Sequence, residues 1–181
     1  REYLLIANSL GREPASNRKA IEASVRYTLR GLEPPATPDE LQALVGAWEH
    51  LPPWPEAAAV LQEVRRRGFV LATLSNGDED MLRRLVANTL PVPFDQVIST
   101  EGGRFKPHPS AYQRALEVLG VRREELLHVA GGAPDAMGAT AFGIRTVWVN
   151  RVADAVVDPR YAPAHQENDL RGVLEVLDSL P

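Results

Sequence analysis

The spacing of apolar residues divides the chain into two parts. In the first part apolar side chains recur every three or four positions, which is the period of an amphipathic helix. Residues 18–30 form one such segment. A second begins at Thr37, which is followed by Pro38 and Glu40 as in a capped helix N-terminus. Its apolar stripe consists of Leu41, Leu44, Val45 and Trp48. We therefore expect residues 1–52 to form a helical subdomain.

Beyond a proline-rich break at 50–56, short apolar runs alternate with helical patterns. The expected strands are 69–74, 96–99, 127–130 and 146–150. The expected helices are 55–67, 78–88, 109–119, 134–142 and 169–180. Near-continuous apolar strands that alternate with helices indicate a parallel sheet covered on both faces. We expect residues 53–181 to form this α/β core, with 158–168 as a surface loop.

Composition narrows the possible functions. The 181 residues are 44% hydrophobic and 24% charged, with a net charge of −4, which is typical of a globular domain and gives no sign of a nucleic-acid partner. The chain has no cysteine, which excludes disulfides, thiolate catalysis and Cys-based zinc sites, and its four histidines lack metal-ligand spacing. No apolar stretch reaches membrane-spanning length. We expect a cytoplasmic protein without membrane or nucleic-acid partners.

A polar turn follows the first expected strand. Ser75, Asn76 and Gly77 come directly after the apolar run and before an expected helix. In open α/β sheets, ligands bind at the carboxyl ends of the strands. The hydroxyl, the amide and the helix N-terminal N–H groups would suit a phosphate or a carboxylate there. Alternatively, the three residues form only a local Asx or Ser turn, with Gly77 supplying an unusual φ.

Charged residues follow two later strands. Lys106 precedes an expected helix, and its ammonium would favour the ionised state of nearby carboxylates and balance an anionic substrate. Asp135 follows Gly131 and Gly132, which allow a close backbone approach, and could bind a metal, position a water or hold Lys106. Tyr112 could reach the same cleft or pack in the core. Taken singly, Lys106 is also explained as a surface lysine, and Asp135 as an acid that complements a helix dipole.

The order and spacing of five stretches resemble the haloacid dehalogenase-like (HAD) hydrolase superfamily, and more narrowly its L-2-haloacid dehalogenase branch. The stretches are VRYTLRGL, LPPWPEAAAVLQEVRRRGFVLATLSNG, FDQVISTEGGRFKPHPSAYQRALEVLGV, LLHVAGGAPDAMGATAFGIRTVWVNR and DLRGVLEVL. Together they cover most of residues 25–181. The resemblance implies an α/β fold with a Rossmann-like parallel-sheet core and a helical cap inserted after the first core strand.

The resemblance also implies a reaction. In the superfamily an aspartate at the end of the first core strand, in a DxxGT or DxDxT context, attacks the substrate and forms an ester or an aspartyl phosphate, which water then cleaves. Ser75 and Asn76 match the motif that holds the anionic group of the substrate. Lys106 matches the third motif and Asp135 the acid of the fourth. Tyr112 matches a tyrosine near the dehalogenase site.

This sequence departs from the family pattern at its beginning. No DxxGT or DxDxT motif precedes Ser75, and Arg1, Glu2 and Tyr3 resemble the interior of the cap. We therefore expect the first core strand and the nucleophile to lie upstream of this chain. In the family that strand lies between the strands that match 69–74 and 127–130. Its absence would leave about 10 Å of unpaired sheet, two strand spacings.

A second departure keeps three hypotheses open. Related phosphatases place a magnesium-binding acid where Gly131 stands, whereas dehalogenases need no metal but carry a serine and an asparagine within the stretch that here reads Ala130, Gly131 and Gly132. The first hypothesis is a cofactor-free 2-haloacid dehalogenase. The second is a Mg²⁺-dependent small-molecule phosphatase, with Asp135 as a metal ligand. The third is a non-catalytic binding module. Both enzymes would take a small anionic substrate, and dimers in the resembling branch make a homodimer possible.

Overall fold

A computed structural model describes residues 16–31, 35–89 and 92–180. The chain separates into two compact units. The first unit comprises the described residues within 1–53 and 72–105, and the second comprises those within 54–71 and 106–181. Each unit has its own parallel strands, which are β1 and β2 in the first and β3, β4 and β5 in the second.

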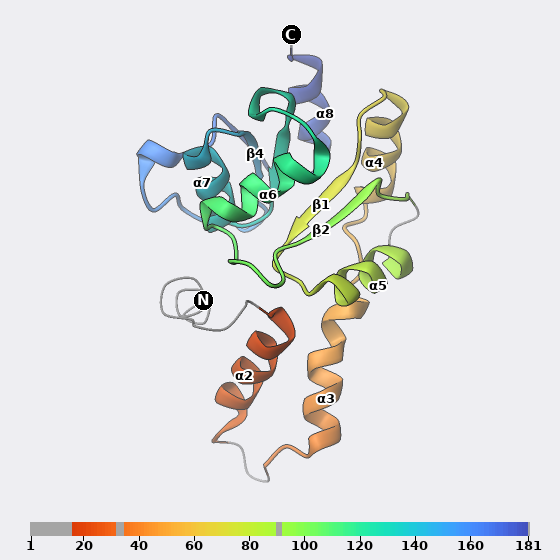
Figure 1. Cartoon of the computed structure of the whole chain (residues 1–181), viewed down its shortest axis with the longest axis vertical. Helices are drawn as coiled ribbons and strands as arrows, with labels where there is room; N and C mark the ends of the chain where they lie inside the picture. The colour runs from red at the N-terminus through yellow and green to blue at the C-terminus, as the bar shows by residue number, and fades with distance from the viewer. Residues whose placement is uncertain (1–15, 32–34, 90–91, 181) are drawn as a thin grey trace. The chain divides into compact units, whose positions relative to one another are not determined.

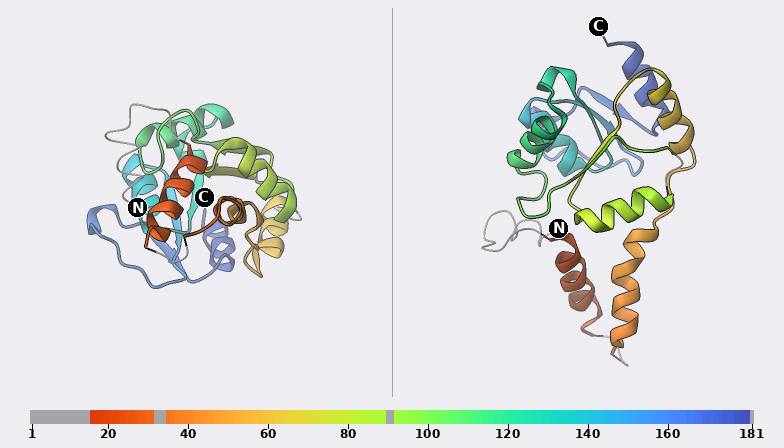
Figure 2. Two further views of the ribbon diagram at one scale, coloured as in Figure 1. Left: turned by 90° about the horizontal axis from the view of Figure 1, so that it is seen from below. Right: turned by 45° about the vertical axis from the view of Figure 1, so that its right-hand side comes forward.

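The first unit contains the helices expected near the start of the chain. Helix α2 (Asn17–Leu29) begins after Ser16, whose hydroxyl accepts the Lys19 N–H, and helix α3 spans Pro38–Gly46. The predicted capping box of α3 is confirmed, because the Thr37 and Glu40 side chains each accept the main-chain N–H of the other. The two helices pack side by side (Figures 1 and 2). The short helix η2 (Ala47–His50) follows α3 and contacts α5.

The strands of the first unit hold the polar turn. Strand β1 (Ala72–Ser75) pairs in parallel with β2 (Gln96–Ser99), which matches its expected bounds. Helix α5 (Glu79–Thr89) follows β1 and packs on β2. The expected strand 69–74 was too long at its start, because Phe69 and Val70 lie before β1 and are 42% and 68% exposed. Their apolar character therefore does not reflect burial within a strand.

The second unit carries the remaining strands. Strand β3 (Leu127–Ala130) pairs in parallel with β4 (Arg145–Val149), and helix α7 (Ala133–Phe142) packs against both strands (Figure 1). Helix α6 (Pro109–Leu119) packs on α7, while helix α4 (Ala57–Arg66) contacts α8 (Arg171–Asp178). Short helices η3 (Arg123–Glu125) and η4 (Pro159–Tyr161) lie in the connections.

One element was missed by the sequence prediction. Residues His165–Glu167 form strand β5, which pairs in parallel with β4, although 158–168 had been expected to be a surface loop. Pairing with β4 supplies hydrogen bonds that the polar segment could not find by itself. Another expectation is only partly confirmed, because Val129 of β3 remains 39% exposed and is not part of a buried apolar run.

The expectation of an upstream strand stays a prediction. Within the described residues, β1 pairs with β2, and β3 pairs with β4, so β1 and β3 make no ladder with each other. Direct pairing of these two strands would have contradicted the prediction. The segment around Arg1, Glu2 and Tyr3 lies outside the described residues. Among the residues that the structure describes, no helix has the length and apolar character needed to span a membrane.

Candidate functional site

The first group of predicted site residues forms the turn after β1. The Gly77 N–H donates to Ser75 Oγ over 3.1 Å, which leaves the serine hydroxyl proton available for donation. The Thr100 hydroxyl donates to Asn76 Oδ1 over 3.2 Å, and the Ser99 hydroxyl donates to the Gly77 carbonyl over 2.6 Å. The local serine turn is therefore present, and the residues at the end of β2 hold it in place. Binding of an anion at this turn stays a prediction.

Gly77 is required by close packing and not by an unusual φ. The turn predicted from the sequence had Gly77 supplying an unusual φ, but the φ of Gly77 is not in the positive range that favours glycine. A Cβ at this position would lie 2.6 Å from Cη2 of Trp48 and 3.0 Å from Leu82. Such a Cβ would therefore overlap the Trp48 ring. Trp48, which belongs to the apolar stripe predicted for the helical segment that begins at Thr37, therefore packs directly on the turn.

The second group of predicted residues meets at one carboxylate in the second unit. Asp135 lies in the first turn of α7, and its Oδ2 accepts a hydrogen bond from Lys106 Nζ over 2.6 Å. Lys106 and Asp135 side chains are only 13% and 21% exposed. The ion pair is therefore shielded from water and screened less than a surface pair. Of the roles considered for Asp135, holding Lys106 is the one that the contacts support.

Two further side chains reach the other carboxylate oxygen. Tyr112 Oη lies 3.0 Å from Asp135 Oδ1 and 3.2 Å from the Asp135 carbonyl oxygen. His128 Nε2 lies 3.1 Å from the same Oδ1, and the ring of Tyr112 meets the His128 ring edge-on at 5.8 Å. Tyr112 is fully buried and also stacks on Phe142. Tyr112 therefore packs in the core and also contacts Asp135, while its role in a substrate site stays a prediction.

Gly138 allows this arrangement. A Cβ at Gly138 of α7 would lie 2.6 Å from Tyr112 Oη and would overlap Pro107. The glycine therefore lets α6 and the segment that carries Lys106 approach α7 closely. This role of Gly138 was not predicted from the sequence.

Burial and neighbouring charges shift the pKa of the Asp135 carboxyl in opposite directions. Burial alone would raise the pKa of the Asp135 carboxyl, but the hydrogen bond and charge of His128, together with Lys106, hold that pKa well below its usual range. The carboxyl is therefore ionised at neutral pH. Burial, followed by the negative charge of Asp135, raises the pKa of the Tyr112 hydroxyl, so that Tyr112 stays a neutral donor.

The glycines before α7 have open surroundings. A Cβ at Gly131 would meet no atom within 4 Å in the described structure, and one at Gly132 would lie 3.9 Å from Pro134. The close backbone approach that these glycines allow therefore stays a prediction. Gly132 is the N-cap of α7, and its carbonyl accepts the N–H groups of Asp135 and Ala136.

The predicted residues thus fall into two sets. Ser75, Asn76 and Gly77 form one turn in the first unit, while Lys106, Tyr112 and Asp135 contact one another in the second. That the two sets serve one site stays a prediction. The contact of His128 with Asp135 was not predicted, because the four histidines had been considered only as metal ligands with paired spacing. The available signal was a histidine within an apolar strand, seven positions before Asp135.

Comparison with known proteins identifies what this chain is similar to. The family model for haloacid dehalogenase-like hydrolases matches residues 7–143. The chain is 32% identical over 164 residues to an (S)-2-haloacid dehalogenase of Pseudomonas sp. (strain YL), which covers 90% of this chain and 71% of that protein.

The chain is also similar to solved structures of haloacid dehalogenases. An L-2-haloacid dehalogenase crystal structure matches with a TM-score of 0.91 and 28% identity, covering 98% of this chain and 80% of that one. The L-2-haloacid dehalogenase of Xanthobacter autotrophicus with covalently bound chloropropionic acid matches with a TM-score of 0.86 and 29% identity. It covers 99% of this chain and 82% of that one.

Proposed function

Because the chain belongs to the haloacid dehalogenase-like hydrolase family, we propose that it is part of an enzyme that hydrolyses 2-haloacids. The partly buried Lys106–Asp135 pair carries the proposal. These two residues match family motifs in sequence, and in the fold they contact each other with Tyr112 as a third partner. The name of the Pseudomonas relative supports an (S)-2-haloacid as the substrate class.

The proposed reaction is a two-step substitution. An aspartate upstream of this chain attacks the carbon that bears the halogen, the carbon–halogen bond breaks, and the halide leaves with the bonding electron pair. The resulting ester is then cleaved by water, which yields the 2-hydroxyacid and restores the carboxylate. No metal or cofactor takes part. The protein has to bind the substrate carboxylate, hold the nucleophile ionised and exclude bulk water.

The residues of this chain would divide those tasks. The Ser75 hydroxyl, the Asn76 amide and the backbone at Gly77 would bind the substrate carboxylate, because donors at the end of a parallel strand suit an anion. The Lys106 ammonium would stabilise the charge of the nucleophile, and Asp135 would position Lys106. The low pKa of Asp135 makes it a better anchor for Lys106 than a base for the attacking water, since a weak base accepts a proton poorly.

The magnesium-dependent phosphatase is less well supported by the donor atoms. Position 131 is a glycine, and both oxygens of Asp135 already accept hydrogen bonds from Lys106, Tyr112 and His128. A cation placed there would meet the Lys106 ammonium. Within residues 16–31, 35–89 and 92–180, no group of three or more His, Asp or Glu side chains could hold a metal ion. These residues do not fit the coordination that magnesium prefers.

The test uses the full-length protein and two substrates. Halide release from L-2-chloropropionate, measured without metal, should occur in the wild type and fall by about 100-fold or more in Lys106→Met, because a charge-stabilising group is lost. Lys19→Met is the matched control, since Lys19 is an exposed residue of α2 and should leave the rate unchanged. Phosphate release from p-nitrophenyl phosphate with Mg²⁺ would instead favour the phosphatase. No turnover of either substrate would favour the binding module.

We also propose a cytoplasmic homodimer. The support is the family itself, in which the resembling branch often forms dimers. Sedimentation equilibrium of the full-length protein should give twice the monomer mass, and a monomer mass at micromolar concentration would rule the dimer out.

A further inference from the structure

His128 contacts the proposed site but has no role in the proposed reaction. It lies on β3, its side chain is only 10% exposed, and its Nε2 is 3.1 Å from Asp135 Oδ1. An ionised carboxylate can only accept hydrogen bonds. His128 Nε2 must therefore carry a proton and donate it to Asp135.

The donors around Asp135 are divided between its two oxygens. Lys106 Nζ binds Oδ2, whereas His128 Nε2 and Tyr112 Oη bind Oδ1. The three donors come from three segments, namely the turn before α6, helix α6 and strand β3. A carboxylate held at both oxygens cannot turn about its Cβ–Cγ bond without breaking hydrogen bonds on both sides. The hydrogen bonds of His128 and Tyr112 to Oδ1 therefore fix the orientation of Oδ2 toward Lys106.

We propose that His128 is a positioning residue, which holds Oδ1 of Asp135 so that Oδ2 is presented to Lys106. The effect on turnover rests on the proposed function, whereas the effect on Lys106 itself does not. The competing explanation is packing, in which the His128 ring only fills the space beside Tyr112. The two explanations differ in which property of the side chain matters, the donor or the ring.

Two substitutions separate the donor from the ring. His128→Phe keeps an aromatic ring against Tyr112 but removes the donor. His128→Gln removes the ring but can place an amide N–H close to the position of Nε2. A positioning role makes the Gln variant the milder change, whereas a packing role makes the Phe variant milder. Which of the two variants has the smaller effect therefore decides between the explanations.

The first readout is the reactivity of Lys106 and needs no catalysis. The chain has two lysines, Lys19 and Lys106, so acetylation by an N-hydroxysuccinimide ester can be followed at each by peptide mass spectrometry, with Lys19 as internal reference. A Lys106 amine that loses its fixed partner samples open positions. We expect its labelling rate relative to Lys19 to rise about two- to ten-fold in His128→Phe. In His128→Gln the ratio should stay close to that of the wild type.

The second readout is steady-state kinetics of the full-length protein with L-2-chloropropionate. His128→Phe should lower kcat about ten-fold and change KM less than about two-fold, because Lys106 acts on the reacting groups and not on substrate affinity. His128→Gln should recover most of kcat. His50→Phe is the control for losing a histidine, since His50 is exposed and lies on η2.

The outcomes distinguish this inference from the proposed function. Equal Lys106 labelling in all three proteins, or a larger change in the Gln variant than in the Phe variant, overturns the positioning role. A wild type without turnover overturns the proposed function, while the labelling order still decides the role of His128. Circular dichroism and thermal unfolding of each variant show whether it is folded, and a folded Phe variant with unchanged labelling counts against the proposal.

Discussion

The carboxylate of Asp78 accepts the main-chain N–H of Asn17, although the two residues are 61 positions apart in the chain. Asp78 also accepts the Arg18 N–H over 3.3 Å and the Ser16 hydroxyl over 2.8 Å, and it is 4% exposed. Helix α2 has no acidic residue in its own first turn, so Asp78 supplies the negative charge that the helix N-terminus favours. Asp78, which directly follows the Ser75–Gly77 turn, thus connects this turn to the start of α2 by hydrogen bonds.

Removing this contact should loosen the start of α2. We expect Asp78→Ala to lower the free energy of unfolding by about 1–2 kcal/mol, as for the loss of a helix cap. The amide protons of Asn17 and Arg18 should exchange faster, which hydrogen-exchange NMR can measure. Asp80→Ala is the control, because Asp80 is exposed, forms surface ion pairs with Arg18 and Arg84, and accepts the Met81 N–H, but within the described residues accepts no main-chain N–H of α2. An equal effect of the two substitutions would contradict the capping role.

Gly77 should not tolerate a side chain. In Gly77→Ala the new methyl group would overlap the Trp48 ring, so we expect a loss of about 1–3 kcal/mol in the free energy of unfolding. Gly131→Ala should be nearly neutral, because its Cβ would meet open space in the described structure. Urea unfolding of the two variants gives the comparison.

The Trp48 contact can be tested further with a double substitution. If the overlap is the cause, Trp48→Phe should reduce the cost of Gly77→Ala, since the smaller ring leaves room for the methyl group. Purely additive losses in a double-mutant cycle would mean that the cost has another origin.

Gly132 should accept a better N-cap. Its backbone has φ −117° and ψ 143°, which any residue can adopt, and α7 has no side-chain cap. We therefore expect Gly132→Ser to raise the free energy of unfolding by about 0.3 kcal/mol, the small difference between a glycine and a serine N-cap. Gly120→Ser should have the opposite effect, because Gly120 ends α6 at φ +65°. Thermal unfolding of both variants checks the two signs, and stabilisation by Gly120→Ser would contradict the backbone argument.

The Asp135 carboxylate should make the free energy of unfolding depend on pH in the acidic range. Its pKa in the folded protein is lowered from an unfolded value near about 3.9, so the folded state is stabilised at every pH well above that value. This contribution should shrink as the pH falls below about 4, toward the lower folded pKa. The difference in unfolding free energy between wild type and Asp135→Asn should therefore be constant from about pH 6 to 8 and decrease under acid conditions. A difference that does not change down to about pH 2 would contradict the assignment.

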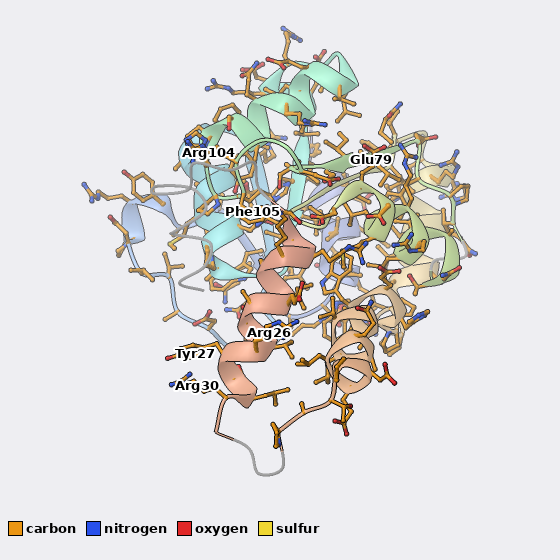
Figure 3. The ribbon with its side chains drawn as sticks, turned by 60° about the horizontal axis from the view of Figure 1, so that its bottom comes forward. Arg26, Tyr27, Arg30, Glu79, Arg104 and Phe105 are labelled. Carbon is orange, nitrogen blue, oxygen red and sulfur yellow. The ribbon has the colours of Figure 1, made fainter. Side chains whose placement is uncertain are left out.

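The outer face of α2 offers a contrast with these interior contacts. The Arg30 guanidinium carbon lies 3.7 Å from the centroid of the Tyr27 ring, and both side chains lie on the same side of the helix (Figure 3). Tyr27 is nevertheless 66% exposed. An exposed cation–π contact contributes little, so this face adds less to the stability of α2 than the buried Asp78 does.

Local sequence signals were enough to predict most elements. Capping residues and helical periodicity predicted α2 and α3, and glycine at the C-terminus of α6 predicted its end at Gly120. Apolar runs gave β2 and β3 with the bounds that the structure has. These signals act within a few residues, through hydrogen bonds and side-chain spacing, and the sequence contains them directly. The sequence also predicted, through the family resemblance, that Lys106, Tyr112 and Asp135 belong to one site, and the structure shows that Lys106 and Tyr112 both contact Asp135.

Other features depended on residues distant in the chain. Strand β5 exists because β4 offers it a pairing edge, and Gly77 is a glycine because Trp48 packs on it. The contact of His128 with Asp135 depends on the pairing of β3 and on the packing of α7 against it, which bring the two side chains together. Such contacts depend on which segments meet in space, and no local pattern encodes that choice. The sequence by itself therefore determined most helices and strands and the positions that match the family motifs, while the packing of those elements decided which side chains contact one another.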